Sequence, residues 1–263
     1  MQRRTLLRAA PLTLLAPAAA PTLAALPEVV AANRPAVVAL GTYRETDNPR
    51  FSFRGTGFAV GDGMTLVTNA HVLPDAASAD PDARLVLQLG RPGPTGEGQY
   101  QVRSLALQAL DREHDLALLR LESGPPLPTL RLAAAEAVRE GQAVAFIGFP
   151  IGGALGFSPV THRGIVASIT PIQLPPPSAR QLDAAAVARA RRGAVFEILQ
   201  LDATAYPGNS GGPLFDAQTG EVVGVLNMVF VKAGRESALS QPTGISYAIP
   251  VRWVHALLAS RQR

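Results

Sequence analysis

Seven consecutive residues toward the C-terminal end of the chain crowd three glycines around one hydroxyl group. Residues 208–214 read GNSGGPL, and the serine is Ser210. Glycine enters backbone conformations that cost other residues energy, so the amide groups of such a turn can converge on one point. Ser210 could act as a nucleophile, with its own N–H and that of Gly208 stabilising the oxyanion formed when a carbonyl is attacked. The same residues also fit a tight turn with an incidental serine.

A serine nucleophile needs a histidine as general base and an acid to orient it, because a hydroxyl is weakly nucleophilic near neutral pH. The chain has 4 histidines, which are His71, His114, His162 and His255. His71 lies in an apolar, strand-like run, whereas His114 directly precedes Asp115. Because neighbours on a strand point to opposite faces, His114 is a poor base for a site that uses Asp115. We interpret His162 and His255 as structural residues.

Three motifs in the order His, Asp, Ser resemble those of chymotrypsin-like serine proteases. They are TNAHV at 68–72, DLALL at 115–119 and GNSGGPL at 208–214. Flanking motifs are similar to the protease domain of the high-temperature-requirement (HtrA, or Deg) family, namely PAVV at 35–38, GTGF at 55–58, GIV at 164–166, QLDA at 200–203 and GISYAIP at 244–250. The resemblance runs from near Glu28 to the C-terminus.

The resemblance implies a catalytic triad. His71 would be the general base, Asp115 the orienting carboxylate and Ser210 the nucleophile. Gly208 and Ser210 would donate the oxyanion N–H groups. Asp111 is the alternative acid, although Asp115 opens the apolar strand as the family pattern requires. The implied activity is that of a serine endopeptidase, which cleaves protein or peptide substrates through an acyl-enzyme intermediate. The alternative is a catalytically silent protein of the same fold that binds polypeptides or acts as a chaperone.

A second enzyme class shares part of the serine motif. Gly208, Ser210 and Gly212 also satisfy the G-x-S-x-G nucleophile elbow of α/β-hydrolases. That fold places its acid and then its histidine after the serine, which it sets between a strand and a helix. The chain after Ser210 contains His255 as its only histidine and reads as strands rather than as repeated strand-helix units. This pattern disfavours the hydrolase elbow.

Short apolar runs bounded by Gly, Pro, Asn or Asp recur along the chain and indicate an antiparallel sandwich or barrel. These runs are 36–43, 57–60, 65–68, 85–89, 116–121, 143–148, 164–169, 196–201, 213–215, 222–230 and 246–249. Hydrophobic residues make up 47% of the chain and charged residues 17%, as in globular proteins. With the resemblance, this pattern predicts an all-β, chymotrypsin-like fold of two six-stranded antiparallel β-barrels with a short C-terminal helix.

The motifs also suggest how the chain is divided. We expect an export signal at 1–25, a first barrel with His71 and Asp115 at 26–124, an inter-barrel linker at 125–142, a second barrel with Ser210 at 143–250 and a C-terminal helix at 251–263. The active site would then lie in the cleft between the barrels. The chain ends shortly after Pro250, where many HtrA relatives continue into a peptide-binding PDZ module, so we expect no such module here.

The N-terminal residues resemble a twin-arginine leader, because Arg3 and Arg4 precede an alanine-rich apolar stretch that reaches Ala25. Three prolines within this stretch disfavour a stable membrane-spanning helix, although a retained anchor is the alternative. We therefore predict an exported bacterial protein of the periplasm or the extracellular space, with no stable membrane span once the signal is removed. HtrA relatives often form trimers, so the resemblance also allows this protein to form a homo-oligomer.

Composition excludes several other kinds of site. The formal net charge of +4 falls close to neutral once Arg3, Arg4 and Arg8 leave with the signal, so we expect no nucleic-acid partner. The chain has 0 cysteines, which rules out disulfides, thiolate zinc sites and a cysteine nucleophile. The histidines form no i, i+4 pair. We expect neither a metal nor any other cofactor.

Substrate preference can be predicted from the residues that would wall the primary pocket in the resembled fold. These are Thr204, Tyr206, Leu226 and Met228. None is acidic, so cleavage after small or medium apolar residues is expected, unless Lys232 or Arg235 folds inward. Asn209 stands where trypsin-like digestive enzymes have an aspartate that pairs with a newly cut N-terminus, so activation by such a cut is not expected. The loop 171–194 falls where relatives carry a regulatory loop, and it is either a gate or a tolerated insertion.

Overall fold

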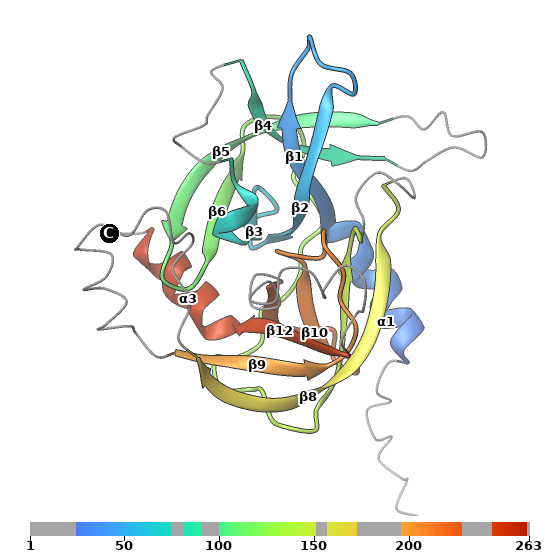
Figure 1. Cartoon of the computed structure of the whole chain (residues 1–263), viewed down its shortest axis with the longest axis vertical. Coiled ribbons are helices and arrows are strands. Elements are labelled where there is room, and N and C mark those ends of the chain that lie inside the picture. Colours follow the sequence, from blue (N-terminus) through green and yellow to red (C-terminus); the bar gives the residue numbers. More distant parts are fainter. Residues whose placement is uncertain are drawn as a thin grey trace, which may run out of the picture.

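The structure is a computed structural model that describes residues 25–74, 82–90, 100–150, 157–172, 196–227 and 244–261. Within these residues the chain forms two closed antiparallel β-barrels of six strands each. Figure 1 shows the first barrel above the second, with helices α1 and α3 on opposite sides of their junction. The two six-stranded antiparallel barrels predicted from the sequence are confirmed.

The first barrel closes through the strand order β1-β2-β3-β6-β5-β4. Its strands are β1 (Val37–Tyr43), β2 (Phe51–Val60), β3 (Thr65–Thr68), β4 (Arg84–Leu89), β5 (Gln101–Asp111) and β6 (Leu116–Leu121). Leucines from four of these strands fill one buried apolar cluster, namely Leu40, Leu66, Leu87 and Leu119. Because the sheet closes on itself, its strands pair on both sides and the barrel holds its shape without an open edge.

The second barrel closes through the order β10-β11-β12-β9-β8-β7. Its strands are β7 (Ala143–Gly148), β8 (Val160–Ile172), β9 (Phe196–Asp202), β10 (Pro213–Asp216), β11 (Val222–Asn227) and β12 (Ile245–Pro250). Another buried cluster joins the two barrels, with Phe58 and Leu118 from the first and Ile147 and Phe215 from the second. This shared core holds the barrels together and thereby sets the residues at their junction relative to one another.

Two helices pack against the barrels. Helix α3 (Val251–Ser260) follows β12 directly and buries Val251, Val254 and Leu257, so the predicted C-terminal helix is present. Helix α1 (Leu26–Asn33) was not predicted, and a 3-10 turn η1 (Arg34–Ala36) joins it to β1. The Asn33 amide donates a 2.9 Å hydrogen bond to the carbonyl of Gly220. The end of helix α1 thus contacts the second barrel.

Strand β5 was missed by sequence reasoning, and β2 and β8 are longer than predicted. Residues 101–111 read QVRSLALQALD, in which leucine, alanine and glutamine favour helix and only one residue is β-branched. The pairing of β5 with β4 and β6 overrides that local preference. In β2 the glycine at position 55 hid the first half of the strand, because glycine usually weakens strands. Strands β3, β6 and β7 match their predicted bounds.

Arg103 of β5 is a buried cation that holds the segment following β6, at the point where the predicted inter-barrel linker begins. Its guanidinium donates to the carbonyl of Ser123 from Nε (3.1 Å) and Nη2 (2.6 Å), and from Nη2 to the carbonyl of Pro125 (2.7 Å). A methyl group on Gly124, whose φ is 87°, would lie 2.7 Å from Nη2, so the linker wraps closely around this side chain. Burial lowers the pKa of Arg103, which stays charged at neutral pH.

Replacing Arg103 by methionine should lower the free energy of unfolding by about 2–4 kcal/mol, because the carbonyls of Ser123 and Pro125 lose a charged hydrogen-bond donor. Urea unfolding followed by the fluorescence of Trp253, the single tryptophan, measures this change. The exposed Arg50 serves as a matched control, and Arg50→Met should change stability by less than about 0.5 kcal/mol. Equal midpoints for the two variants would contradict the role assigned to Arg103.

Candidate active site

The predicted base and acid lie on two turns of the first barrel. His71 belongs to a 3-10 turn, η2 (Ala70–Val72), that follows β3, rather than to the strand itself. Asp115 precedes β6 and has a φ of 52°. Strands β3 and β6 pair with each other, from Thr65↔Arg120 to Thr68↔Ala117. The hydrogen-bonded register of two neighbouring strands therefore brings the turn after one beside the turn before the other.

The carboxylate of Asp115 holds His71 at two points. Oδ1 accepts the backbone N–H of His71 at 2.9 Å, and Oδ2 lies 2.6 Å from the ring Nδ1. Since an ionised carboxylate only accepts, Nδ1 carries the proton and the ring's other nitrogen, Nε2, is left with a lone pair. The His71 side chain is 31% exposed and that of Asp115 14%. The arrangement fixes both the tautomer and the orientation of the imidazole.

Further contacts hold Asp115 from outside its own turn. Asn227, fully buried at the end of β11 in the second barrel, donates from Nδ2 to Asp115 Oδ2 at 2.7 Å. The carbonyl of Asp115 accepts from the Asn69 amide (3.0 Å) and from the backbone N–H of Ala70 (3.1 Å). Sequence reasoning considered the β11 segment only as a pocket wall, and Asn227 was missed. An amide in an otherwise apolar buried strand was the available signal.

Ser210 lies on a tight turn whose glycines permit close approach to neighbouring backbone. Gly208 has a φ of 101°, and a methyl group there would lie 2.2 Å from the carbonyl oxygen of Phe149. Gly211 has a φ of 84°, and its methyl group would lie 2.1 Å from the carbonyl oxygen of Thr56. Any side chain at either position would displace the turn. The reading of GNSGGPL as a conformationally special turn agrees with this geometry.

Thr56, on β2 of the first barrel, fastens this turn across the barrel junction. Its backbone N–H donates to the carbonyl of Ser210 at 2.8 Å, and its hydroxyl donates to the carbonyl of Gly208 at 2.7 Å. The same hydroxyl accepts from the N–H of Phe149 at 3.2 Å, and the carbonyl of Thr56 accepts from the Thr68 hydroxyl at 2.7 Å. Thr56 is fully buried. It was quoted in a motif but not predicted to contact the serine turn.

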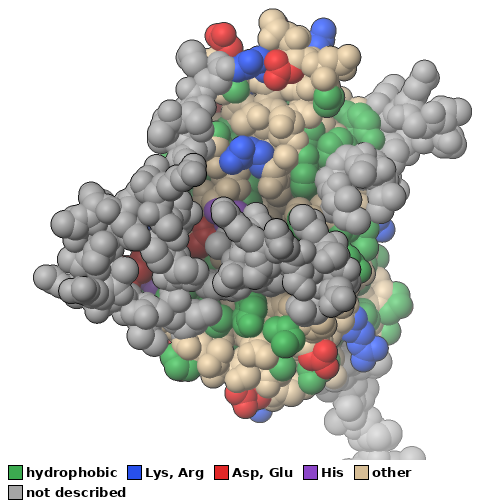
Figure 2. All heavy atoms as spheres, viewed as in Figure 1, with side chains coloured by type: hydrophobic (Ala, Val, Ile, Leu, Met, Phe, Trp, Pro, Cys, Tyr) green, Lys and Arg blue, Asp and Glu red, His purple; other side chains and the backbone are tan. Residues whose placement is uncertain are grey.

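The turns of His71 and Ser210 meet at Gly55. A methyl group on Gly55 would lie 2.7 Å from Val72 Cγ2 and 3.1 Å from the carbonyl oxygen of Ser210. Figure 2 shows histidine and acidic side chains next to one another at the level where the barrels meet. Within the described residues no hydrogen bond joins His71 Nε2 to Ser210 Oγ. Such contacts are commonly long in resting proteases and tighten when a substrate is in place.

The two N–H groups expected to bind an oxyanion have no acceptor among the described residues. Among the described residues, neither the N–H of Gly208 nor that of Ser210 donates a hydrogen bond, whereas those of Asn209, Gly211 and Gly212 donate to carbonyls of the turn or of β11. Asn209 itself is fully buried, and its side-chain amide has no hydrogen-bond partner in the described part of the chain. The expected oxyanion donors thus have no protein acceptor in the part of the chain that the structure describes.

The other histidines have partners elsewhere. His114 binds Asp111 through Nδ1 at 2.7 Å, so the alternative acid belongs to the alternative histidine. His114 and Asp115 lie on the turn between β5 and β6, so the expectation that they are neighbours on a strand was wrong. His114 nevertheless makes no contact with the Asp115 carboxylate. His162 stacks on Phe146 with ring centroids 4.8 Å apart, and burial lowers its pKa. His255, on α3, lies 2.9 Å through its Nε2 from the backbone carbonyl of Ala133.

The predicted pocket walls are described only in part. Thr204 and Tyr206 precede the serine turn and are partly buried, and Leu226 is buried on β11. Met228 lies outside the described residues, as does the loop 171–194 beyond Ile172. The export signal predicted at 1–25 also lies outside them, apart from Ala25. No helix in the described ranges is long and apolar enough to cross a membrane, and these ranges hold no cluster of three metal-binding side chains.

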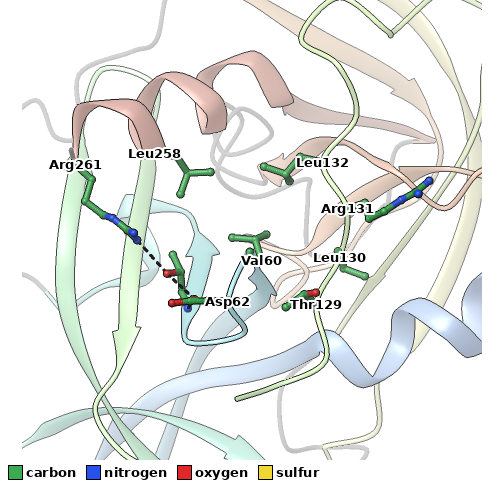
Figure 3. Close-up of a pocket in the computed structure, with 10 residues that line it drawn as sticks. Val60, Asp62, Thr129, Leu130, Arg131, Leu132, Leu258 and Arg261 are labelled. Carbon is green, nitrogen blue, oxygen red and sulfur yellow. Dashed lines mark hydrogen bonds between the residues drawn. The ribbon is translucent and has the colours of Figure 1, made fainter. Parts of the chain in front are cut away.

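A hollow of about 470 Å³ lies between the β2–β3 turn, residues 129–132 and α3 (Figure 3). Its lining does not include His71, Asp115 or Ser210. Leu130, Leu132 and Leu258 point into it, and Arg261 reaches across to donate to the Thr65 hydroxyl at 3.1 Å. A hydrogen bond from Arg120 lowers the pKa of Asp62 at its rim to about 2. The lining has no histidine, and Asp62 with its lowered pKa is a weak base for activating a nucleophile.

Comparisons with known proteins agree with the family that the sequence resembles. Residues 55–225 match the trypsin-like peptidase domain. A probable periplasmic serine endoprotease, DegP-like, from Pseudomonas putida is 29% identical over 197 residues, which are 75% of this chain and 32% of that protein. The mitochondrial serine protease HTRA2 of Bos taurus is 32% identical over 226 residues, 85% of this chain and 40% of that protein. The chain thus spans about a third of the length of the first curated relatives it matches.

Solved structures agree with the fold. The HtrA-type protease AlgW, in a variant solved with a tripeptide, superimposes with a TM-score of 0.60 at 25% identity, covering 90% of this chain and 63% of that one. Deg5 gives a TM-score of 0.60 at 24% identity and covers 87% of this chain and 90% of that one. The two barrels therefore have the chymotrypsin-like arrangement predicted from the sequence. This chain belongs to the trypsin-like peptidase family and is an HtrA-like protease domain.

Proposed function

We propose that the protein is a serine endopeptidase with a triad of Ser210, His71 and Asp115. The observation that carries the proposal is the double contact of the Asp115 carboxylate with the N–H and the Nδ1 of His71. This contact prepares the lone pair of Nε2 to accept a proton, and the Ser210 turn meets the His71 turn at Gly55. The named serine proteases among the relatives support the same reaction class.

In the first half of the reaction, Ser210 Oγ attacks the scissile carbonyl carbon. The new C–O bond forms as His71 Nε2 takes the hydroxyl proton, and the carbonyl electron pair moves onto oxygen. The resulting oxyanion accepts hydrogen bonds from the N–H groups of Gly208 and Ser210, which have no other acceptor within the described residues. When the C–N bond breaks, His71 returns the proton to the leaving amine, and the acyl group stays on Ser210.

The second half hydrolyses this acyl-enzyme. His71 takes a proton from water, whose oxygen attacks the acyl carbon, and returns it to Ser210 Oγ as the acid product leaves. Asp115 remains ionised throughout and stabilises the imidazolium in both halves. Asn227 gives the carboxylate a further donor at 2.7 Å, which helps to hold it in place while the charge on His71 changes.

The substrates that we propose are polypeptides cleaved after small or medium apolar residues. Thr204, Tyr206 and Leu226 are the described wall residues, and none of them could neutralise a lysine or arginine side chain. A peptide library read by mass spectrometry tests this preference, and dominant cleavage after Arg or Lys would refute it. We further propose a periplasmic location reached by the twin-arginine route, because relatives are named periplasmic and Arg3 and Arg4 precede an alanine-rich apolar stretch.

Thr56 should matter for catalysis because its hydroxyl and N–H fasten the Ser210 turn. Thr56→Val keeps the shape of the side chain but leaves the Gly208 carbonyl and the Phe149 N–H without partners. We expect kcat to fall by about 10–100-fold with little change in KM, because a displacement of about 1 Å can cost that much. Thr56→Ser retains the hydroxyl and should keep kcat within about threefold. Steady-state kinetics on a fluorogenic peptide measures both.

Covalent labelling with a fluorophosphonate tests the proposed function directly. Such a reagent phosphonylates a serine that has an activated hydroxyl and releases fluoride. Peptide mapping then identifies the modified residue. We expect a single labelled site at Ser210 and no label in Ser210→Ala or after urea unfolding. Circular dichroism of Ser210→Ala confirms that its loss of label does not reflect loss of fold.

The labelling experiment also separates the two candidate classes. Folded protein that takes no label, or label that persists in Ser210→Ala, would overturn the nucleophile assignment. Under that outcome a catalytically silent polypeptide-binding protein becomes the better explanation. Protection of an aggregating client by Ser210→Ala at the level of the unmodified protein would indicate a chaperone-like activity independent of Ser210.

A further inference from the structure

The turn between β5 and β6 carries His114 and Asp115 side by side, yet their side chains serve different partners. Asp115 binds His71, whereas the ring of His114 binds Asp111 and packs on the second half of the chain. We propose that His114 is a positioning residue that holds this turn so that the Asp115 carboxylate faces His71. The inference rests on the proposed function, because it takes Asp115 as the orienting carboxylate.

The backbone at Asp115 needs support from its surroundings. Its φ of 52° makes it the only non-glycine residue with positive φ in the described part of the chain. The left-handed conformation is costly for a residue that has a Cβ atom, and it persists where neighbouring contacts enforce it. If the turn relaxed to a negative φ at Asp115, the direction of its side chain would change. The carboxylate would then leave the N–H and Nδ1 of His71.

Asp111 and His114 build the turn that leads into this conformation. Oδ1 of Asp111 accepts the backbone N–H groups of Glu113 and His114, both at 3.0 Å, and Oδ2 lies 2.7 Å from His114 Nδ1. Burial works to raise the pKa of Asp111, but the hydrogen bonds from His114 and Glu113 outweigh it and lower the pKa. One carboxylate thus holds both the backbone and the ring of His114, as Asp115 does for His71.

The ring of His114 also ties the turn to the other half of the molecule. Its side chain is only 10% exposed and stacks on Trp253 of α3, with ring centroids 3.6 Å apart and planes 20° from parallel. Phe196 of β9 meets the same ring edge to face at 4.9 Å. Aromatic contacts of this kind stabilise a structure beyond the burial of their apolar surface. His114 therefore pins a turn of the first barrel to α3 and the second barrel.

Three side chains from the second half of the chain consequently hold two consecutive residues of the first barrel, His114 and Asp115. Asn227 holds the Asp115 carboxylate itself, and Trp253 with Phe196 holds the residue before it. A hollow of about 390 Å³ opens beside the stack, between the turn and α3. The turn therefore has room to move toward α3 once the ring is removed.

The expected consequence of losing the ring is a defect in turnover rather than in substrate binding. His114 points toward α3 and β9, so it lies away from the predicted pocket walls. We expect His114→Ala to lower kcat by about 10–100-fold, because misplacing a catalytic group by about 1 Å can cost a factor of that size. KM should stay within about twofold, and fluorophosphonate labelling of Ser210 should slow by the same factor as kcat.

A second variant guards against simple unfolding. His114→Phe keeps an aromatic ring on Trp253 but loses the hydrogen bond to Asp111, so it should fold and still lower kcat at least about fivefold. His255→Ala is the matched control, because it removes an imidazole of α3 that binds the carbonyl of Ala133 and does not touch the turn. It should turn over within about twofold of the unmodified protein at temperatures well below its unfolding transition.

A double-mutant cycle separates positioning from general destabilisation. If His114 acts through Asp115, adding His114→Ala to Asp115→Asn should lower kcat no further, since the oriented carboxylate is already lost. Multiplied effects in the double variant would overturn the inference. So would a folded His114→Ala or His114→Phe with kcat within twofold of the unmodified protein. Failure of the unmodified protein to label at Ser210 would instead refute the proposed function.

Discussion

Replacing His71 by alanine should lower kcat for peptide hydrolysis by about 10⁶-fold, and replacing Ser210 as well should lower it no further. The reason is that the two residues perform one proton transfer. Without His71 Nε2 the hydroxyl of Ser210 stays protonated, and without Ser210 the base has no nucleophile to activate. A residual rate about 10³-fold above that of water is expected to survive from the oxyanion donors and substrate binding.

Three variants measured on one peptide substrate test this expectation: His71→Ala, Ser210→Ala and the double variant. Progress curves followed over days give the residual rates. Only the three variants are first treated with fluorophosphonate, which inactivates contaminating proteases, whereas the unmodified protein and the control are left untreated. His162→Ala provides the matched control, because it removes a histidine stacked on Phe146 of the second barrel. Effects that multiply in the double variant, or a single variant that retains a tenth of the activity, would show that His71 and Ser210 do not act together.

Asp115→Asn should lower kcat by about 10⁴-fold, which corresponds to about 5.5 kcal/mol of lost transition-state stabilisation. The carboxylate accepts three N–H groups, two from His71 and one from Asn227. An amide has one oxygen and one NH2 group, so at least one of these donors would face another donor. With the NH2 group toward Nδ1, the ring of His71 would carry its proton on Nε2. It could then not accept the proton of Ser210.

The measurement compares kcat and KM of Asp115→Asn with those of Asp216→Asn. Asp216 is a matched control because its carboxylate also accepts several hydrogen bonds, from Gln218, Thr219 and Gln142, but it lies at the end of β10 away from His71. We expect Asp216→Asn to change stability while leaving kcat within about threefold. A small effect of Asp115→Asn together with a large effect of Asp111→Asn would mean that the acid had been assigned to the wrong residue.

Much of the candidate site could be predicted from the order of three sequence motifs. A glycine-rich turn around Ser210 is readable because glycine alone tolerates a φ near 101° with the Phe149 carbonyl so close. His71 and Asp115 could be placed because each adjoins an apolar run, and those runs are the paired strands β3 and β6. Neighbouring strands of similar polarity leave clear local signals, so their ends can be matched without coordinates.

Other features left no local signal. Strand β5 has the composition of a helix and is a strand because β4 and β6 supply its hydrogen-bond partners. The assignment of Asp111 to His114 required their side-chain contact, since either carboxylate on this turn is close in sequence to a histidine. Periodicity and propensity report on a residue's immediate neighbours, so they do not reveal which of two nearby acids turns toward which ring.

Sequence alone thus predicted the all-β class and the approximate positions of most strands, and its family resemblance supplied the three residues that we propose for the triad. The contacts that hold those residues became visible only with the fold: Thr56 on Gly208, Asn227 on Asp115, and Trp253 on His114. The first pair is separated by 152 residues and the second by 112. Turns and strands follow from local backbone preferences, whereas these contacts arise when two closed barrels and a C-terminal helix are packed around one shared core.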